Sequence, residues 1–455
     1  MYAKKIAEFV GSLSYEDLPR EVIVKTKECT RDHVGCILGA YPLQEAKMIA
    51  EWARDLGDRP ESTILGFGYK TSCRNAALAN GYLSEVLEMQ DGLTSANMHP
   101  ASCVQPAALA LAECLKKGPK EFITAVVAGY EVGNRVAESL PAEKSTGTMK
   151  TGTAGTFASA AAAGKLLGLN VPQLINALGI AGFLLPLSTR ENVWGTTIKP
   201  AHPGQASMVG IESALLAQKG FTGCQEIFMG TPPRHLGFCN VISQDPLYEK
   251  LIEGLGEKYT IMDVYYKPYS ACRLSHSAVE AALALVQENV IDPAMVQKIE
   301  VKTYARASRE LGKRFPNPES SISFCQFSIP YLMASVVWDR AISPKSYTRE
   351  KISNPKILEL AKLVEVTADE AMTRVYPEKA PARVRIILRN GTSFEKQVDV
   401  LKWEPSRGIP VEEQMAKYYS LAAEVLSREK AEMVAQKIHH LERVEISDLM
   451  KDLVK

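Results

Sequence analysis

The chain has 455 residues, 46% of them hydrophobic and 23% charged, which is enough for two or three globular domains and excludes long disordered stretches. Its 53 basic side chains nearly balance 52 acidic ones, and the formal net charge of +1 argues against a broad positive field for nucleic acid or an anionic membrane. A few placed cations would therefore have to hold any anionic ligand.

The beginning of the chain, residues 1–19, has no apolar stretch of signal-peptide length and predicts an amphipathic helix. The longest apolar run, Leu174–Leu187, is interrupted by Gly179, Gly182 and Pro186 and is too short to cross a bilayer. The nine cysteines form no CxxC pair and no Cys/His ligand spacing, and their odd number is typical of reduced thiols. We expect a cytoplasmic protein with no structural zinc and no iron–sulfur cluster.

Up to about residue 259, apolar residues recur at spacings of three and four, which predicts one helix after another. Several of these segments are apolar on almost every face, as is typical of helices buried among other helices. The pattern indicates one large all-α domain and not a series of βαβ units. The predicted helices are Arg20–Leu38, Leu43–Leu56, Asn75–Leu87, Pro106–Leu115, Lys120–Leu140, Phe157–Leu167, Val171–Phe183 and Ala206–Gln218.

Beyond residue 259 the pattern changes to strands mixed with helices. Lys298–Tyr304, Arg383–Leu388 and Phe394–Val400 alternate apolar and polar residues, which predicts strands. Asn390-Gly391 between the last two predicts a hairpin. The helices predicted here and after Pro405 are Ser277–Glu288, Pro330–Asp339, Pro355–Leu363, Val411–Leu426 and Glu429–Leu441.

The two patterns together predict a mainly α protein. A large all-α helical domain would comprise residues 1–265 and 405–455. A smaller α+β lid domain, residues 266–404, would be inserted before the C-terminal helices.

One stretch, Asn80–Glu113, carries candidate chemistry between two predicted helices. It reads as the end of one helix, a polar loop whose acidic residues Glu85, Glu88 and Asp91 lead to His99, and a new helix beyond Pro106. A carboxylate and an imidazole on an ordered loop suit proton transfer, because His titrates near neutral pH. A helix connection with a solvated His would show the same residues.

A second stretch, Gly147–Phe157, places small residues, Lys150 and Thr151 before an Ala-rich helix. The N–H groups of a helix start can hold a carboxylate, although a simple capping turn fits the same residues. The spacing is not that of a P-loop, and no GxGxxG follows a strand, so no nucleotide cofactor is indicated.

Three further stretches precede or begin predicted helices and carry basic or phenolic side chains. Singly, each such residue is usually solvated or packed in a core. Together they predict a pocket for a substrate with two or three carboxylates, with a general acid and base. The residues are Lys199 and His202, then Lys267, Tyr269, Arg273 and His276, and finally Tyr331.

In order along the chain stand NG…LEMQDG…HP…PAALALAE, TGTAGTFASAAAAGKLLGL, KPAHPG with QKGFTG, YKPY and FSIPY. This ordered set, which spans nearly the whole chain, resembles the MmgE/PrpD family. That family includes 2-methylcitrate dehydratases, cis-aconitate decarboxylases and iminodisuccinate epimerase. The resemblance implies a large helical domain, a smaller α+β lid domain, a homodimer, and catalysis without a metal or an organic cofactor.

The resemblance also implies which residues form the site. The family's acidic loop residues fall on Glu88 and Asp91 and its loop histidine on His99. The remaining positions, two lysines, a histidine and a phenol, fall on Lys199, Lys267, His276 and Tyr331.

The chain departs from the decarboxylase-like members at several positions of these motifs. Glu85 stands where they have His, Glu88 where they have Asp, and Gly92 where they have Thr. Met149-Lys150-Thr151 stands where they have His-Pro-Thr, so an imidazole is missing there. The departures leave open which reaction of the family this chain performs.

We predict a cofactor-independent enzyme that removes a proton α to a carboxylate of a small di- or tricarboxylate, with no metal ligands. His99 would be the principal acid/base, and Asp91 would orient its ring or raise its pKa. Lys199 would stabilise the developing charge, and Tyr331 would be a second proton donor. Substrate binding is expected from Glu88, Lys150, Thr151, His202, Lys267 and His276.

Three functions remain open at this point. A lyase, either a dehydratase or a decarboxylase of the 2-methylcitrate/cis-aconitate type, is favoured because most named relatives in the family are lyases. An epimerase or isomerase of a succinate-like dicarboxylate is the second. A non-catalytic helical dimer that binds metabolites is the third, and it would predict that Asp91, His99 and Lys199 lie far apart. For all three a homodimer is expected, since so many apolar helices should leave a face to cover.

Overall fold

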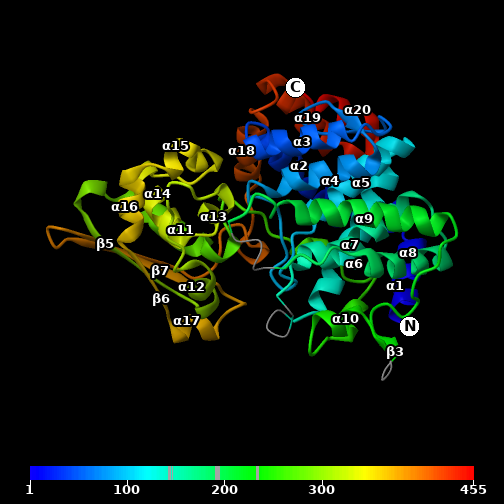
Figure 1. Ribbon diagram of the computed structural model, residues 1–455, viewed down its shortest axis with the longest axis horizontal. Coiled ribbons are helices and arrows are strands. Elements are labelled where there is room, and N and C mark those ends of the chain that lie inside the picture. Colours follow the sequence, from blue (N-terminus) through cyan, green and yellow to red (C-terminus); the bar gives the residue numbers. More distant parts are fainter. Residues whose placement is uncertain (142–144, 146, 190–194, 232–234) are drawn as a thin grey trace.

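Helices make up most of the fold, so the predicted mainly α class is confirmed. The computed structural model describes residues 1–141, 145, 147–189, 195–231 and 235–455, and these contain twenty α-helices and three small sheets. Figure 1 shows two bodies side by side, one almost wholly helical and one in which helices accompany a sheet. No helix within the described residues is long and apolar enough to cross a membrane.

The helical body is built from both ends of the chain. Its C-terminal helices return to pack on α2 beside the N-terminal ones, and Figure 1 shows them in red next to blue. The helices are α1 Tyr2–Ser12, α2 Arg20–Ala40, α3 Gln44–Asp55, α4 Cys73–Glu85, α5 Ala101–Leu115, α6 Pro119–Glu138, α7 Lys150–Leu166, α8 Val171–Leu184, α9 Ala201–Gln218, α10 Phe238–Ile242, α18 Val411–Ala422, α19 Arg428–His439 and α20 Ile446–Asp452. Two short hairpins, β1 Ser62–Thr63 with β2 Lys70–Thr71 and β3 Gly230–Thr231 with β4 His235–Leu236, accompany them.

Small residues let the central helices approach one another closely. At Gly204 of α9, a Cβ atom would lie 2.2 Å from the carbonyl oxygen of Leu78 in α4, so no larger residue fits without movement. This contact draws the start of α9 against α4. The side chains that flank the start of α9 are therefore held next to the end of α4.

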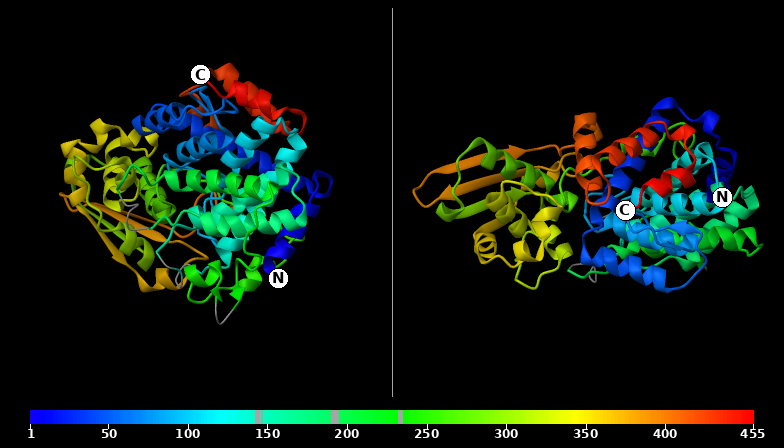
Figure 2. Two further views of the ribbon diagram at one scale, coloured as in Figure 1. Left: turned by 45° about the vertical axis from the view of Figure 1, so that its right-hand side comes forward. Right: turned by 90° about the horizontal axis from the view of Figure 1, so that it is seen from above.

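The α+β body carries a four-stranded sheet of order β6-β5-β7-β8, in which β5 and β6 are parallel and the other pairs antiparallel. Helices α11 and α14 pack against the sheet, and Figure 2 shows this body from two further sides. The strands are β5 Val296–Thr303, β6 Val364–Ala368, β7 Ala382–Leu388 and β8 Ser393–Val398. The helices are α11 His276–Glu288, α12 Ala305–Leu311, α13 Ile322–Gln326, α14 Ile329–Asp339, α15 Arg349–Ile352, α16 Pro355–Lys362 and α17 Glu370–Arg374.

The predicted hairpin is confirmed, because β7 and β8 are antiparallel neighbours and Gly391 between them has a φ of 88°. Strand β6 was not predicted. Its sequence, VEVTA, is five residues long and follows α16 directly, so it offers too short an alternation to stand out.

Buried apolar side chains fall into two main clusters. The first runs from Ala3 to Tyr266 and resumes at Trp403, and the second lies within Ala271–Leu388. Two separate cores are what the predicted domains would produce, one of residues 1–265 with 405–455 and the other of residues 266–404. The boundaries themselves, and a lid role for the α+β body, stay predictions.

Three helices begin five to seven residues before their predicted starts. Helices α5, α7 and α9 start at Ala101, Lys150 and Ala201, although Gly, Pro and Thr near these starts suggested loops. Burial among neighbouring helices outweighs weak intrinsic propensity. As a result, Lys150 and His202 lie on the first turns of helices and not in the loops before them.

Candidate active site

A narrow cavity of about 80 Å³ lies where the two bodies meet. The loop after α4, the start of α7, Lys199 before α9, and segment 265–274 contribute walls from one side. The other side comes from α12 and from Phe327 of the α+β body. The described lining residues are Glu88, Asn97, His99, Thr148, Met149, Lys150, Thr151, Lys199, Tyr265, Lys267, Cys272, Arg273, Leu274, Arg306, Glu310 and Phe327.

His99 lines this cavity with a fixed ring. Its Nδ1 lies 2.6 Å from the main-chain oxygen of Asp91, and its main-chain N–H donates to Thr151 Oγ1 at 3.1 Å. A carbonyl oxygen only accepts, so Nδ1 carries the proton and Nε2 is the unprotonated nitrogen. Burial, together with the charge of Lys267, lowers the pKa of His99 to about 3. The imidazole is therefore neutral at neutral pH, and its unprotonated Nε2 can accept a proton.

Asp91 holds the histidine by its backbone and not by its carboxylate. Its Oδ1 accepts from the main-chain N–H of Ala101 at 3.0 Å, and its Oδ2 accepts from the Tyr130 hydroxyl at 2.8 Å. Burial raises the pKa of Asp91 to about 7. Asp91 thus orients the His99 ring, which is one of the two roles predicted for it. The hydrogen bond to the Asp91 carbonyl also acts to raise the pKa of His99, but burial outweighs it and lowers that pKa overall.

Two lysines and two glutamates form a buried chain of charges beside His99. Lys199 Nζ lies 2.5 Å from Glu85 Oε1 and also contacts Glu88 Oε1, while Lys267 Nζ lies 2.8 Å from Glu88 Oε2. None of the four side chains is more than 3% exposed. The bridging residue Glu88 has a left-handed φ of 53°, a conformation that costs a non-glycine residue about 1–3 kcal/mol. The same carboxylate makes two buried ion pairs, which hold this backbone conformation in place.

The four charged side chains shift one another's pKa values. Burial tends to raise the pKa of Glu85, but Lys199 and the other cations outweigh it and lower the pKa to about 2. Burial lowers the pKa of Lys267 to about 8, against the opposing effect of Glu85. The glutamate is thus ionised at neutral pH, and Lys267 loses its proton in mildly alkaline solution.

The α+β side of the cavity supplies an arginine that the sequence analysis did not single out. Arg306 on α12 donates to Glu310 Oε1 at 3.1 Å and to the Tyr376 hydroxyl at 2.9 Å. Arg273 stacks 4.1 Å from the centre of the Tyr265 ring and donates to a carboxylate oxygen of Glu404. The described lining therefore holds five basic side chains and two acidic ones. Such a lining suits an anionic ligand.

The remaining predicted binding residues lie at or near the cavity in different ways. Lys150 and Thr151 line it, and the Lys150 ammonium donates to the Ala137 carbonyl at 2.9 Å. His202 lies behind the lining with Nδ1 2.6 Å from the Lys199 carbonyl oxygen, and its Nε2 has no hydrogen-bond partner among the described residues. His276 is also behind the lining, 3.4 Å from Arg273 Nη1. The two histidines thus support neighbouring residues of the site.

Tyr331 is not brought to the cavity. It is fully buried in the core of the α+β body, its hydroxyl donates to the Ser346 carbonyl at 2.5 Å, and its ring stacks on Tyr347. A phenol within the apolar run IPYLMASVV is typical of a packed core residue. The expected second proton donor therefore has no geometric support at this position.

Comparisons with known proteins agree over almost the full chain. The MmgE/PrpD N-terminal domain model matches residues 4–250 and the C-terminal domain model matches residues 269–443. A cis-aconitate decarboxylase of Aspergillus terreus is 25% identical over 98% of this chain and 94% of its own length. The cis-aconitate decarboxylases of Mus musculus and Homo sapiens are each 23% identical over 99% of this chain, and over 93% and 94% of their own lengths.

Proposed function

Because the chain belongs to the MmgE/PrpD family, we propose that it is an enzyme that moves a proton at the carbon next to a carboxylate of a small di- or tricarboxylate. One observation carries the proposal. The neutral imidazole of His99 faces the same narrow cavity as a group of basic side chains that includes Lys199 and Lys267.

The proposed chemistry uses each of these groups in turn. His99 Nε2 takes the α proton, since Nδ1 is already committed to the Asp91 carbonyl. The electron pair left behind spreads onto the carboxylate as an enediolate. Lys199 and Lys267 stabilise that charge in a site shielded from water, where fixed cations act most strongly. Glu85 and Glu88 hold the two ammonium groups in place before substrate binds.

A lyase is the first candidate reaction. The relatives compared above carry the name cis-aconitate decarboxylase, and they match this chain from end to end. In a dehydratase, the electron pair left by the α proton expels the β-hydroxyl, which takes up a proton and leaves as water. In a decarboxylase, carbon dioxide leaves instead, and the carbon that loses it takes up a proton. We propose a citrate-like or aconitate-like tricarboxylate, and no metal or organic cofactor, for that reaction.

An epimerase of a succinate-like dicarboxylate is the second candidate. Lys150, which stands where decarboxylase-like members of the family have another residue, lines the cavity from the start of α7. A second proton carrier on a separate element would allow reprotonation of the other face of the substrate carbon. A purely binding protein is less well supported, because His99 and Lys199 share one cavity and Asp91 touches His99.

Incubating the protein in D₂O with succinate-like, citrate-like and aconitate-like acids, followed by NMR, tests the proposal. Alkene formation by loss of water, or carbon dioxide release with deuterium uptake into the product, would support the lyase. Exchange without net conversion would support the epimerase. No exchange and no conversion with any acid of the panel would contradict the proposed chemistry.

Replacing Lys267 by Ala should mainly raise KM, because the cavity loses a cation that binds a substrate carboxylate. In the unmodified enzyme, kcat/KM should fall as the pH rises through about 8, where Lys267 loses its charge. Steady-state kinetics measured across pH checks both the rise in KM and the fall in kcat/KM. Lys267→Arg is the matched control: because Arg stays charged, the fall in kcat/KM should move to a higher pH. An unchanged KM in the Ala variant would contradict this role.

Treatment with EDTA should leave the turnover rate unchanged, because no described group of potential metal ligands lies at the cavity. Initial rates measured before and after chelation and dialysis check this. A loss of rate that added zinc or magnesium restored would contradict this prediction.

A homodimer is expected from an exposed apolar groove on the helical body. Phe183, Leu187, Phe221 and Leu236 line the groove, and each is at least 61% exposed. Exposed apolar side chains gathered in this way are typical of protein interfaces. Light scattering should give about twice the mass of one chain, and a monomer at micromolar concentration would contradict the expectation.

A further inference from the structure

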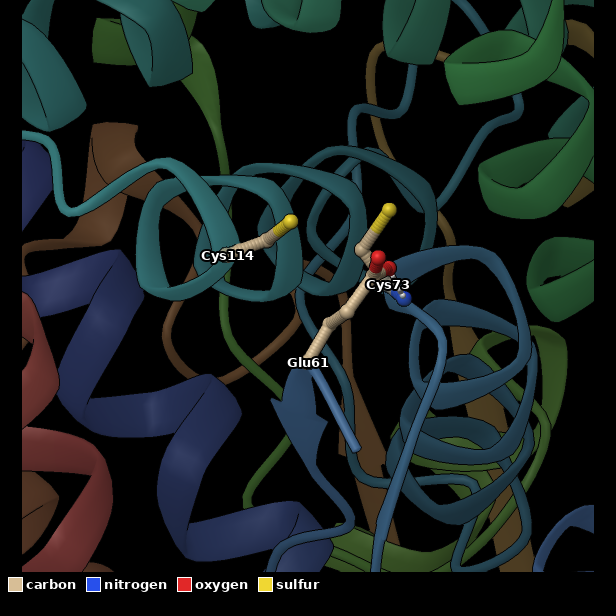
Figure 3. Close-up of side chains that lie close together, drawn as sticks. All are labelled: Glu61, Cys73 and Cys114. Carbon is tan, nitrogen blue, oxygen red and sulfur yellow. Dashed lines mark hydrogen bonds between the residues drawn. The ribbon is translucent and has the colours of Figure 1, made fainter. Parts of the chain in front are cut away.

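Three potential metal ligands that do not line the cavity come together beside the first turn of α4 (Figure 3). Glu61 directly precedes β1, Cys73 is the first residue of α4, and Cys114 lies in the last turn of α5. One carboxylate oxygen and the two Sγ atoms all lie within 4.8 Å of one another. The spacing of these three residues matches no ligand motif, so the sequence predicts no zinc site.

The donor set suits one class of ion. Two thiolates with a carboxylate favour Zn²⁺ over Mg²⁺ or Ca²⁺, which prefer oxygen alone. Zn–S bonds of about 2.3 Å and Zn–O bonds of about 2.0 Å in a tetrahedron place ligand atoms about 3.5–3.8 Å apart. The observed group therefore needs a contraction of about 1 Å or less to hold the ion.

Neighbouring residues hold the three potential ligands in place and leave them accessible to an ion. Glu61 Oε2 accepts from the main-chain N–H of Cys73 at 3.3 Å, which holds the carboxylate at the start of α4. The nearby Glu113 is already used, because it accepts from Thr63 and pairs with Lys70. Cys73 is buried, whereas Glu61 and Cys114 are half-buried, so an ion and a water molecule have access.

We propose that Glu61, Cys73 and Cys114 bind a Zn²⁺ ion, with water as its fourth ligand. The ion would tie the outer end of α4 to the outer end of α5. The inner ends of the same two helices flank the loop that carries Glu88 and His99, about 18 Å away along α4. The site is therefore a clamp on the pair of helices that supports the cavity, and the ion takes no part in the reaction.

The test uses the reduced full-length protein, titrated with zinc and then dialysed. Elemental analysis should find about one Zn²⁺ per chain, and the ion should raise the thermal unfolding midpoint. Co²⁺ in its place should give thiolate-to-metal charge-transfer absorption. Cys114→Ser should weaken zinc binding by about 10-fold or more and abolish the stabilisation. Cys224→Ser, which changes an exposed cysteine outside the group, should bind zinc as the unmodified chain does.

A second variant guards against misfolding. Glu61→Gln keeps both cysteines and removes the charged oxygen ligand, so it should also weaken zinc binding while circular dichroism stays unchanged. The proposal is overturned if the unmodified reduced chain retains no zinc, or if Cys114→Ser and Glu61→Gln retain as much as it does. A Cys73–Cys114 disulfide in protein isolated without reductant, combined with no zinc uptake after reduction, would show a redox pair instead.

Discussion

Replacing His99 by Gln is expected to lower kcat by about 100-fold or more with little change in KM, the effect of losing a general base. The amide of Gln keeps hydrogen-bonding capacity near the Asp91 carbonyl but cannot accept a proton from carbon. Since the basic side chains of the cavity remain, the substrate should still bind. Steady-state kinetics on the acid identified by the NMR panel measures both constants.

The pH dependence of the same enzyme separates His99 from an ordinary surface histidine. Because the pKa of His99 is lowered to about 3, kcat/KM should not decline near pH 6.5 through protonation of this imidazole. His439→Gln, at an exposed histidine at the end of α19, is the matched control and should leave kcat unchanged. An unaltered kcat in the His99 variant would reassign the base to another residue of the cavity.

Replacing Lys199 by Met is expected to lower the free energy of unfolding by about 3–5 kcal/mol, which is typical of removing one partner from a buried ion pair. Glu85 would then be buried without its cation, and Glu88 would keep only Lys267. Urea unfolding followed by circular dichroism measures the change. The variant should also lose activity, because Lys199 stabilises the developing charge in the proposed mechanism.

Two control variants show whether the broken ion pairs cause the lower free energy of unfolding. Adding Glu85→Gln to the Lys199 variant should recover part of the stability, since a neutral amide costs less to bury than an unpaired carboxylate. Lys4→Ala, at an exposed helical pair with Glu8, should change the free energy of unfolding by less than about 1 kcal/mol. A Lys199 variant as stable as the unmodified protein would contradict the prediction.

Acid should weaken the ion pair of Glu85 with Lys199 within a defined pH range. The pKa of Glu85 is about 2 in the folded protein against a usual 4.5, so its stabilising effect is complete above pH 4.5 and is lost as the pH falls towards 2. The Lys199 variant no longer has the main cause of that lowering. Its stability should therefore decline less steeply with acid than that of the unmodified protein.

Periodicity was sufficient to predict most of the helices, because long segments with repeated apolar spacing leave few alternatives. It failed where packing overrode local preference. The starts of α7 and α9 are rich in small residues that suggest loops, yet close contacts such as that of Gly204 with α4 hold them as helices. Strand β6 depends on its pairing with β5, which lies about 65 residues earlier in the chain.

For the site, sequence motifs identified His99, Lys199 and Lys267, which the structure gathers in one cavity. They did not show that Glu85 is the partner of Lys199, because the two are 114 residues apart. Arg306 carried no motif and reached the cavity only through the folding of the α+β body. Tyr331 illustrates the opposite error, since its motif position suggested a cleft although its apolar neighbours place it in a core.

The size of the cavity and the contacts of the two bodies have a kinetic consequence. A volume of about 80 Å³ is well below the roughly 300–1,000 Å³ of ligand pockets, so the proposed di- or tricarboxylate would enter only if the walls moved. Gln326 and Ser270 donate to the carbonyls of Val86 and Leu87 at 3.1 and 2.6 Å, directly before the strained Glu88. Separating the bodies would pull on this turn and loosen the hold of Glu88 on its lysines. Substrate entry and release of the Lys199 and Lys267 ammonium groups from Glu88 would then occur in one step. The rate of that step would be an upper limit on the turnover rate.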